Sequence, residues 1–113
     1  MEIDIEIYET PNGKRPFEAW IKDVREIHTR SKILTRLDRL KLGNFGDCKT
    51  IDDGVCELRI HYGPGIRVYY GKAGSKVILL LCGGDKGSQQ RDIAKAKEYL
   101  NEYQTREKGH GKK

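Results

Sequence analysis

Two short stretches of alternating apolar and polar residues, 55–61 and 66–70, flank a Gly-Pro-Gly sequence at residues 63–65. A period of two is typical of a β-strand with one buried face, and glycine with proline is typical of a tight turn. Together they predict a β-hairpin. Because a one-residue slip turns every side chain over, the apolar residues limit which pairings the two strands can adopt.

Facing both apolar sets toward one core predicts that Leu58 lies opposite Tyr70 and Ile60 opposite Val68. The same register sets Arg59 across from Tyr69 and His61 across from Arg67. It also predicts one polar face turned away from the core, whose members are Glu57, Arg59, His61, Arg67 and Tyr69.

The N-terminal half predicts a strand at residues 3–7, where isoleucines alternate with acidic residues, and two helices. The first helix begins near Pro16 and extends to His28. The second is capped by Thr29 or Ser31 and ends at Gly43. Residues 44–54 are polar and rich in glycine, and predict a loop.

In the C-terminal half, residues 77–82 are continuously apolar, as in an interior strand covered on both faces. Residues 83–87 predict a turn, and Ser88 caps a last helix with a buried stripe through Ile93, Ala96 and Leu100. We therefore expect an α+β fold in the order strand, helix, helix, strand, strand, strand, helix. The helices are expected on one side of a mostly antiparallel sheet.

The 113 residues suit one domain, which we place at 1–103, followed by a flexible basic tail at 104–113. The net charge is +5, but the last eight residues supply +3 of it, so overall charge is a weak argument for nucleic acid. No apolar run is long enough to span a membrane and no basic leader precedes an apolar segment, so a cytoplasmic protein is expected.

The three cysteines, at positions 48, 56 and 82, form no close pair, and the three histidines are scattered. The sequence thus predicts neither a disulfide framework nor a metal site, and no cofactor. Cys56 and Cys82 lie in apolar runs, where a buried thiol is expected.

The polar hairpin face carries the chemistry that the sequence suggests. Arg59 and Arg67 present planar forks suited to a phosphodiester, and Lys86 follows the neighbouring strand. Gln90 and Arg91 lie on the first turn of the last helix, where free N–H groups favour anions. The opposing interpretation is that cross-strand pairs of these polar residues serve solubility and modestly stabilise the sheet. Composition alone slightly favours this second interpretation.

Arg36 and Arg39 belong to the basic residues of the second predicted helix. A solvated helix face is the ordinary interpretation, and a surface for RNA is the alternative. His61 alone has an ordinary pKa near neutrality, which makes it a candidate for proton transfer.

Several motifs resemble the RelE/ParE superfamily of bacterial toxins, in particular its HigB-like branch of addiction-module killer proteins. They are ELR at residues 57–59, RVYY at 67–70, LLLCGGDKGSQQRDI at 79–93 and AKEY at 96–99. The resemblance extends from the first strand to about Tyr103, and the segment 83–99 is its specific part.

The resemblance implies the toxin of a type II toxin–antitoxin system. Such a toxin is a ribosome-associated endoribonuclease that cuts mRNA without metal, by attack of the ribose 2′-hydroxyl, and a helix-turn-helix antitoxin neutralises it. The matching catalytic positions are Arg59, Arg67 and Lys86. Relatives often have a tyrosine or histidine near the last helix, where this chain has Gln90 and Arg91, so the acid and base stay unassigned and His61 is a possible substitute.

Tyr69, Arg91, Arg36 and Arg39 are the expected RNA contacts. Two alternatives remain open. One is a gyrase-binding toxin of the ParE type without nuclease activity, and the other is a non-toxic relative that only binds an antitoxin.

Overall fold

The computed structural model describes residues 2–111, and the side chains of residues 2–108. Its elements in chain order are β1 (Asp4–Ile7), α1 (Pro16–Asp23), α2 (Ile27–Lys41), β2 (Cys48–Thr50), β3 (Val55–Ile60), β4 (Ile66–Gly74), β5 (Val77–Asp85), a short 3₁₀ turn η1 (Lys86–Ser88) and α3 (Gln89–Gly111).

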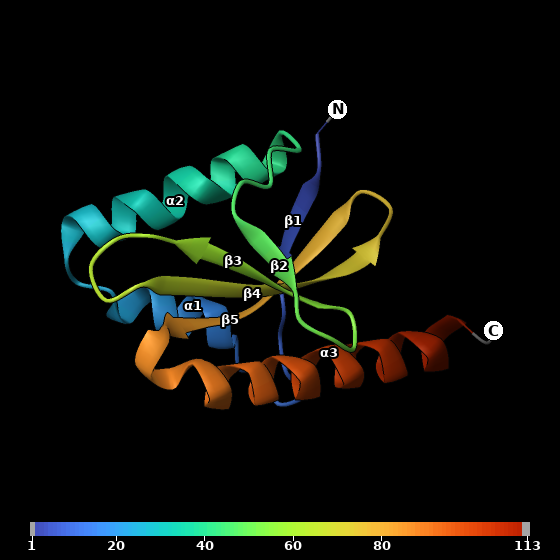
Figure 1. Ribbon diagram of the computed structural model, residues 1–113. Coiled ribbons are helices and arrows are strands. Elements are labelled where there is room, and N and C mark those ends of the chain that lie inside the picture. Colours follow the sequence, from blue (N-terminus) through green and yellow to red (C-terminus); the bar gives the residue numbers. More distant parts are fainter. Residues whose placement is uncertain (1, 112–113) are drawn as a thin grey trace.

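The five strands form one twisted sheet in the order β1-β5-β4-β3-β2 (Figure 1). Strand β1 pairs with β5 in parallel, while the other neighbours pair antiparallel. The apolar run of β5 therefore lies between two strands, which confirms its predicted interior position.

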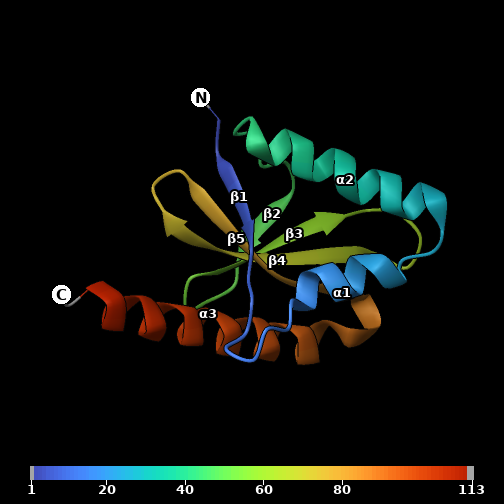
Figure 2. The same cartoon turned by 180° about the vertical axis from the view of Figure 1, so that it is seen from behind.

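Helices cover both faces of this sheet, and Figures 1 and 2 show α2 and α3 on opposite sides of it. Phe17 of α1 and Ile33 of α2 belong to one core, while Ala96 and Leu100 of α3 belong to a second. The expectation of a RelE-like, mostly antiparallel sheet with all helices on one side is thus wrong. The sheet is mixed and lies between two helical layers.

The physical reason lies in the apolar residues of the sheet itself. In β5, Ile78 and Leu80 face the first core, and Leu79 and Leu81 face the second. Two buried faces need two covers, because exposing either would leave a large apolar surface in water. The final helix provides the second cover.

The hairpin forms as predicted, but its register differs by two residues. Leu58 pairs with Val68 and Arg59 with Arg67, rather than with Tyr70 and Tyr69. A shift of two residues keeps every side chain on the same face, so the apolar pattern cannot distinguish the two registers. The loop between the strands therefore spans 61–65, and His61 lies outside both strands.

The polar hairpin face is not turned away from a core, which corrects a second expectation. Helix α3 packs on this face, so Glu57 and Tyr69 are fully buried beneath it. Alternation identified the face correctly, but it could not show which element covers it.

Two boundaries in the N-terminal half also differ from expectation. Strand β2 lies within the predicted loop and extends the sheet by one short edge strand. Helix α2 starts at Ile27, so His28 belongs to it rather than to the first helix. Glu26 caps α2 by accepting hydrogen bonds from the His28 and Thr29 N–H groups, in place of a Thr29 or Ser31 cap.

Helix α3 continues past residue 103, where the predicted tail begins, and extends to Gly111. Arg106 Nη2 donates hydrogen bonds of 2.9 Å to the Glu9 carbonyl and to Glu102 Oε1. Residues 104–111 are therefore helical, whereas 112–113 lie outside the described residues. Within the described part of the chain, no helix combines the length and apolarity needed to span a membrane.

We expect Gly83→Ala to lower the free energy of unfolding by about 1–3 kcal/mol, because it overpacks the core. A Cβ atom at Gly83 would overlap two carbons of the Trp20 ring. Chemical denaturation measures the change. The control is Ala94→Ser on the exposed face of α3. Gly63→Ala is less useful, because Gly63 has a positive φ. An unchanged denaturation midpoint for Gly83→Ala would contradict the prediction and show that the Trp20 ring moves to make room for the Cβ atom.

Candidate functional site

One buried carboxylate organises the polar side chains of the hairpin. Glu57 is 0% exposed. Its Oε1 accepts from Arg59 Nε at 3.0 Å, and its Oε2 accepts from the Tyr69 hydroxyl at 3.0 Å and from Gln89 Nε2 at 2.9 Å. Arg67 Nε lies 3.5 Å from the same Oε2. We call Glu57, Arg59, Arg67, Tyr69 and Gln89 the Glu57 cluster.

These contacts determine the ionisation of Glu57. Burial alone would raise its pKa, but hydrogen bonds from Arg59, Gln89 and Tyr69 outweigh burial and hold the pKa below its ordinary value. Burial and the bond to Glu57 raise the pKa of Tyr69, so its hydroxyl stays protonated at neutral pH. Glu57 is therefore a permanent counter-ion for the arginines rather than a proton donor.

The two arginines reach Glu57 from adjacent strands. Arg59 of β3 and Arg67 of β4 form a cross-strand pair, and Tyr69 follows Arg67 by two residues on the same face. Their side chains are 32% and 15% exposed, respectively. Arg67 Nη1 also donates to the Gly65 carbonyl at 3.1 Å, while its buried Nε has no acceptor in good hydrogen-bond geometry among residues 2–108. The protein thus leaves part of each guanidinium uncommitted.

Lys86 lies beside Arg67, as the sequence predicted. A Cβ atom built on Gly65 would lie 3.3 Å from Arg67 Nη1 and 3.9 Å from Lys86 Cβ, so the three residues are neighbours. Asp85 and Ser88 form a capping box around η1, which holds Lys86 at the end of β5. This end of the sheet therefore carries the cations Arg59, Arg67 and Lys86 together with the carboxylates of Glu57 and Asp85.

Gln89, which the sequence analysis missed, completes the cluster in place of Gln90. It lies four residues before Ile93 and therefore shares the sheet-facing stripe of α3. That spacing was the available signal. Gln90 and Arg91 are exposed, and Arg91 lines a hollow with Trp20 and Val24 on the α1 side.

His61 is not part of the cluster. Its imidazole Nε2 lies 2.5 Å from Asp47 Oδ2, and its side chain is 76% exposed. The bond to His61 holds the pKa of Asp47 below its ordinary value. The predicted pairing of His61 with Arg67 is therefore wrong, because the loop moves His61 toward α2.

His61 instead belongs to a basic groove of about 420 Å³ beside α2. Its lining, which we call the α2 groove, is His28, Ser31, Lys32, Thr35, Arg36, Arg39, Ile60 and His61. Arg39 is exposed there, but Arg36 is used internally: its Nη1 donates to the Arg59 carbonyl at 2.6 Å and its Nη2 to the Phe45 carbonyl at 3.1 Å. Arg36 therefore has a structural role in joining α2 to the end of β3.

Tyr69 was expected to contact RNA, but it is buried and its hydroxyl is bound to Glu57. Cys82 is also buried, and burial raises its pKa to about 12, as suits an unreactive thiol. Neither side chain is available to a ligand in this conformation.

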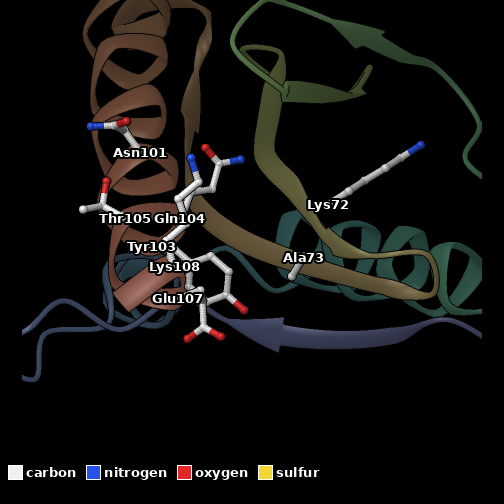
Figure 3. Close-up of a pocket in the computed structure, with 8 residues that line it drawn as sticks. All are labelled: Lys72, Ala73, Asn101, Tyr103, Gln104, Thr105, Glu107 and Lys108. Atoms are coloured by element: carbon white, nitrogen blue, oxygen red, sulfur yellow. The ribbon is translucent and has the colours of Figure 1, made fainter. Parts of the chain in front are cut away.

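A second open groove lies far from the Glu57 cluster, between the C-terminal part of α3 and β4 (Figure 3). Lys72 and Ala73 form one wall, and Tyr103, Glu107 and Lys108 lie on the helix opposite. In Figure 3 the Lys72 ammonium points away from the other labelled side chains. Lys72 and Lys108 thus do not converge on one point, unlike Arg59 and Arg67.

We expect acid to weaken the fold through Glu57. Its folded pKa is depressed, so its contribution to stability is fully present above its unfolded pKa, near the ordinary value of 4.5, and is lost as pH falls through the lower folded value. Urea midpoints measured from pH 7 to pH 2 should fall in wild type below about pH 4. In Glu57→Gln the fall should be smaller, and an identical pH profile would contradict this assignment.

The fold and the cluster define a small α/β protein with an arginine pair held by a buried glutamate at one end of a mixed sheet. No protein-family model matches the chain. It is similar to an uncharacterized protein of Haemophilus influenzae, with 44% identity over 81 residues that cover 72% of this chain and 82% of the relative. The chain belongs to the same family as that protein.

Proposed function

We propose that this chain is the toxin of a type II toxin–antitoxin system and cuts mRNA at the ribosome without a metal cofactor, as its motif resemblance to HigB-like toxins suggests. The supporting observation is the arginine pair on Glu57 with Lys86 beside it. Two arginines with a lysine at the neighbouring strand end suit a phosphodiester with its additional charge in the transition state. The proposal places the protein in the bacterial cytoplasm.

In this proposal the arginines bind the scissile phosphate through the guanidinium atoms that the protein leaves uncommitted. Arg59 donates to Glu57 through Nε and its side chain is partly exposed, so its two Nη atoms are proposed to bind the ligand. Glu57 orients the Arg59 guanidinium through a hydrogen bond, and the Gly65 carbonyl orients that of Arg67, which reduces the entropy lost when a phosphate binds. Lys86, which is exposed, supplies a further mobile cation.

In the proposed reaction the ribose 2′-oxygen attacks the adjacent phosphorus, and the bond between phosphorus and the leaving 5′-oxygen breaks. This reaction produces a cyclic phosphate and a 5′-hydroxyl end, and requires that a proton leave the 2′-hydroxyl and another reach the leaving oxygen. Glu57 is held ionised and Tyr69 protonated by their contacts, so neither suits rapid exchange at pH 7. The proposal therefore assigns rate enhancement to charge neutralisation and orientation, and leaves proton transfer to solvent or to groups of the ribosome.

The α2 groove is proposed to hold flanking RNA. Arg39 and Lys32 are exposed on one stripe of α2, seven residues apart, which corresponds to about 10 Å along the helix axis. Arg36 contributes indirectly by fixing the Arg59 carbonyl. The partner that neutralises the toxin is proposed to be a helix-turn-helix antitoxin.

The decisive experiment incubates purified protein with translating ribosomes and a labelled mRNA in the presence of a metal chelator that spares ribosome-bound magnesium. The proposal expects fragments with 5′-hydroxyl ends and growth arrest when the chain is expressed alone. Intact mRNA with growth arrest and DNA-damage signalling would favour gyrase inhibition. Normal growth would favour a non-toxic antitoxin-binding relative, and either result would overturn the proposal.

A further inference from the structure

Two cysteines that are eight residues apart in the sequence lie on adjacent strands at the sheet edge. Cys48 of β2 pairs with Leu58, and Thr50 pairs with Cys56 of β3, so both thiols are on one face, diagonally across the ladder. The backbone bonds from Arg59 N to the Asp47 carbonyl and from Ile51 N to the Val55 carbonyl lie at the intervening positions. Cys48 and Cys56 therefore belong to two successive non-hydrogen-bonded pairs and are diagonal neighbours.

Tyr70 provides a second geometric observation. It pairs with Cys56 across the β3–β4 ladder. Burial, and then the neighbouring Cys56 and Cys48 thiols, raise the pKa of its hydroxyl. On the opposite side, Thr50 Oγ1 lies 3.9 Å from Cys56 Sγ. The register therefore places Cys48, Cys56 and Tyr70 on one face of three adjacent strands.

A small movement of β2 would bring the Cα atoms of Cys48 and Cys56 within the distance that a disulfide needs. Diagonal neighbours in a regular ladder have Cα atoms about 7–8 Å apart, whereas a disulfide needs about 4.4–6.8 Å. The right-handed twist of a β-ladder shortens the diagonal that joins these two positions. Strand β2 is an edge strand of three exposed residues, so it can shift without disturbing either core.

We propose that Cys48 and Cys56 form a reversible intramolecular disulfide in response to peroxide. The exposed Cys48 thiolate attacks one peroxide oxygen, and the O–O bond breaks to give a sulfenic acid and water. Cys56 sulfur then attacks the sulfenic sulfur, and the S–O bond breaks with release of a second water. Two thiols are oxidised and one peroxide is reduced, and a small dithiol reverses the bond by exchange.

The disulfide would fix the segment next to the Glu57 cluster. Asp47 immediately precedes Cys48, its carbonyl accepts from Arg59 N, and its carboxylate contacts His61. Joining β2 to β3 therefore restrains the backbone that carries Arg59. The inference stands on strand geometry and does not depend on the proposed nuclease activity.

The test treats the full-length reduced protein with hydrogen peroxide and counts free thiols after denaturation. Wild type is expected to fall from three free thiols to one, to lose two hydrogen atoms in mass as a monomer, and to recover all three with dithiothreitol. A peptide map should join the segments that contain Cys48 and Cys56. The Tm of the oxidised form should rise by about 5 °C or more, since the bond closes a loop in the unfolded chain.

Three variants complete the design. Cys82→Ser, which removes the buried thiol, should still lose two thiols, while Cys48→Ser and Cys56→Ser should form no intramolecular bond. With Cys56→Ser, a sulfenic acid at Cys48 should be trapped by dimedone. Retention of all three thiols by wild type, a bond to Cys82, or only disulfide-linked dimers would each overturn the proposal.

Discussion

Glu57→Ala is expected to lower the free energy of unfolding by about 3–5 kcal/mol, the usual cost of removing one partner from a buried ion pair. The change leaves Arg59 and Arg67 near one another without their shared carboxylate. It also removes the acceptor of the Tyr69 hydroxyl and of the Gln89 amide, both of which lie beneath α3. For a domain of this size, such a loss is a large fraction of the total stability.

Urea denaturation followed by circular dichroism measures this loss. Glu18→Ala is the matched control, because Glu18 forms only partly exposed pairs with Arg15 and Lys22, which are expected to contribute less than about 1 kcal/mol. Glu57→Gln should lie between wild type and Glu57→Ala, since the amide retains one acceptor. A loss below about 1 kcal/mol for Glu57→Ala would show that the carboxylate is not the centre of the cluster.

Arg67→Ala is expected to reduce mRNA cleavage by about 100-fold or more, the usual effect of removing one donor that stabilises transition-state charge. Arg67→Lys keeps the charge but loses the planar fork, so its activity should fall between Arg67→Ala and wild type. Fragment formation on translating ribosomes and growth arrest on expression provide two independent measurements.

Lys86→Ala separates activity from folding, because Lys86 is exposed and makes no contact with Glu57 among the described residues. It should lose activity with an unchanged Tm. Arg25→Ala removes an equal charge from an exposed position on the α1–α2 connection and should retain full activity. If Arg67→Ala folds and cuts as well as wild type, the cluster is a structural feature only.

Local pattern was sufficient to predict most of the elements. Alternation at residues 55–60 and 66–70 predicted the hairpin, and the apolar run at 77–82 predicted the interior strand. Pro16 and Gly43 indicated a helix start and a helix end correctly, because their backbone preferences act within one or two residues. Strand β2 was missed, since three exposed residues next to a glycine-rich segment carry no periodic signal.

The candidate site was predicted only in part. Arg59 and Arg67 lie on one face, because parity places them there, and Lys86 lies at the adjoining end of β5. His61 was grouped with them on a register two residues away from the real one. Gln90 was predicted in place of Gln89, although side chains at neighbouring positions of a helix point about 100° apart.

The sequence by itself determined which residues share a strand face, since side-chain parity is a local property of an extended chain. Only the tertiary structure decided what that face meets. Helix α3 packs on the hairpin and converts Glu57 from an expected surface residue into a buried counter-ion, and β2 brings Cys48 to Cys56. Such pairings depend on which distant segments bury apolar area together, and no local pattern contains that information.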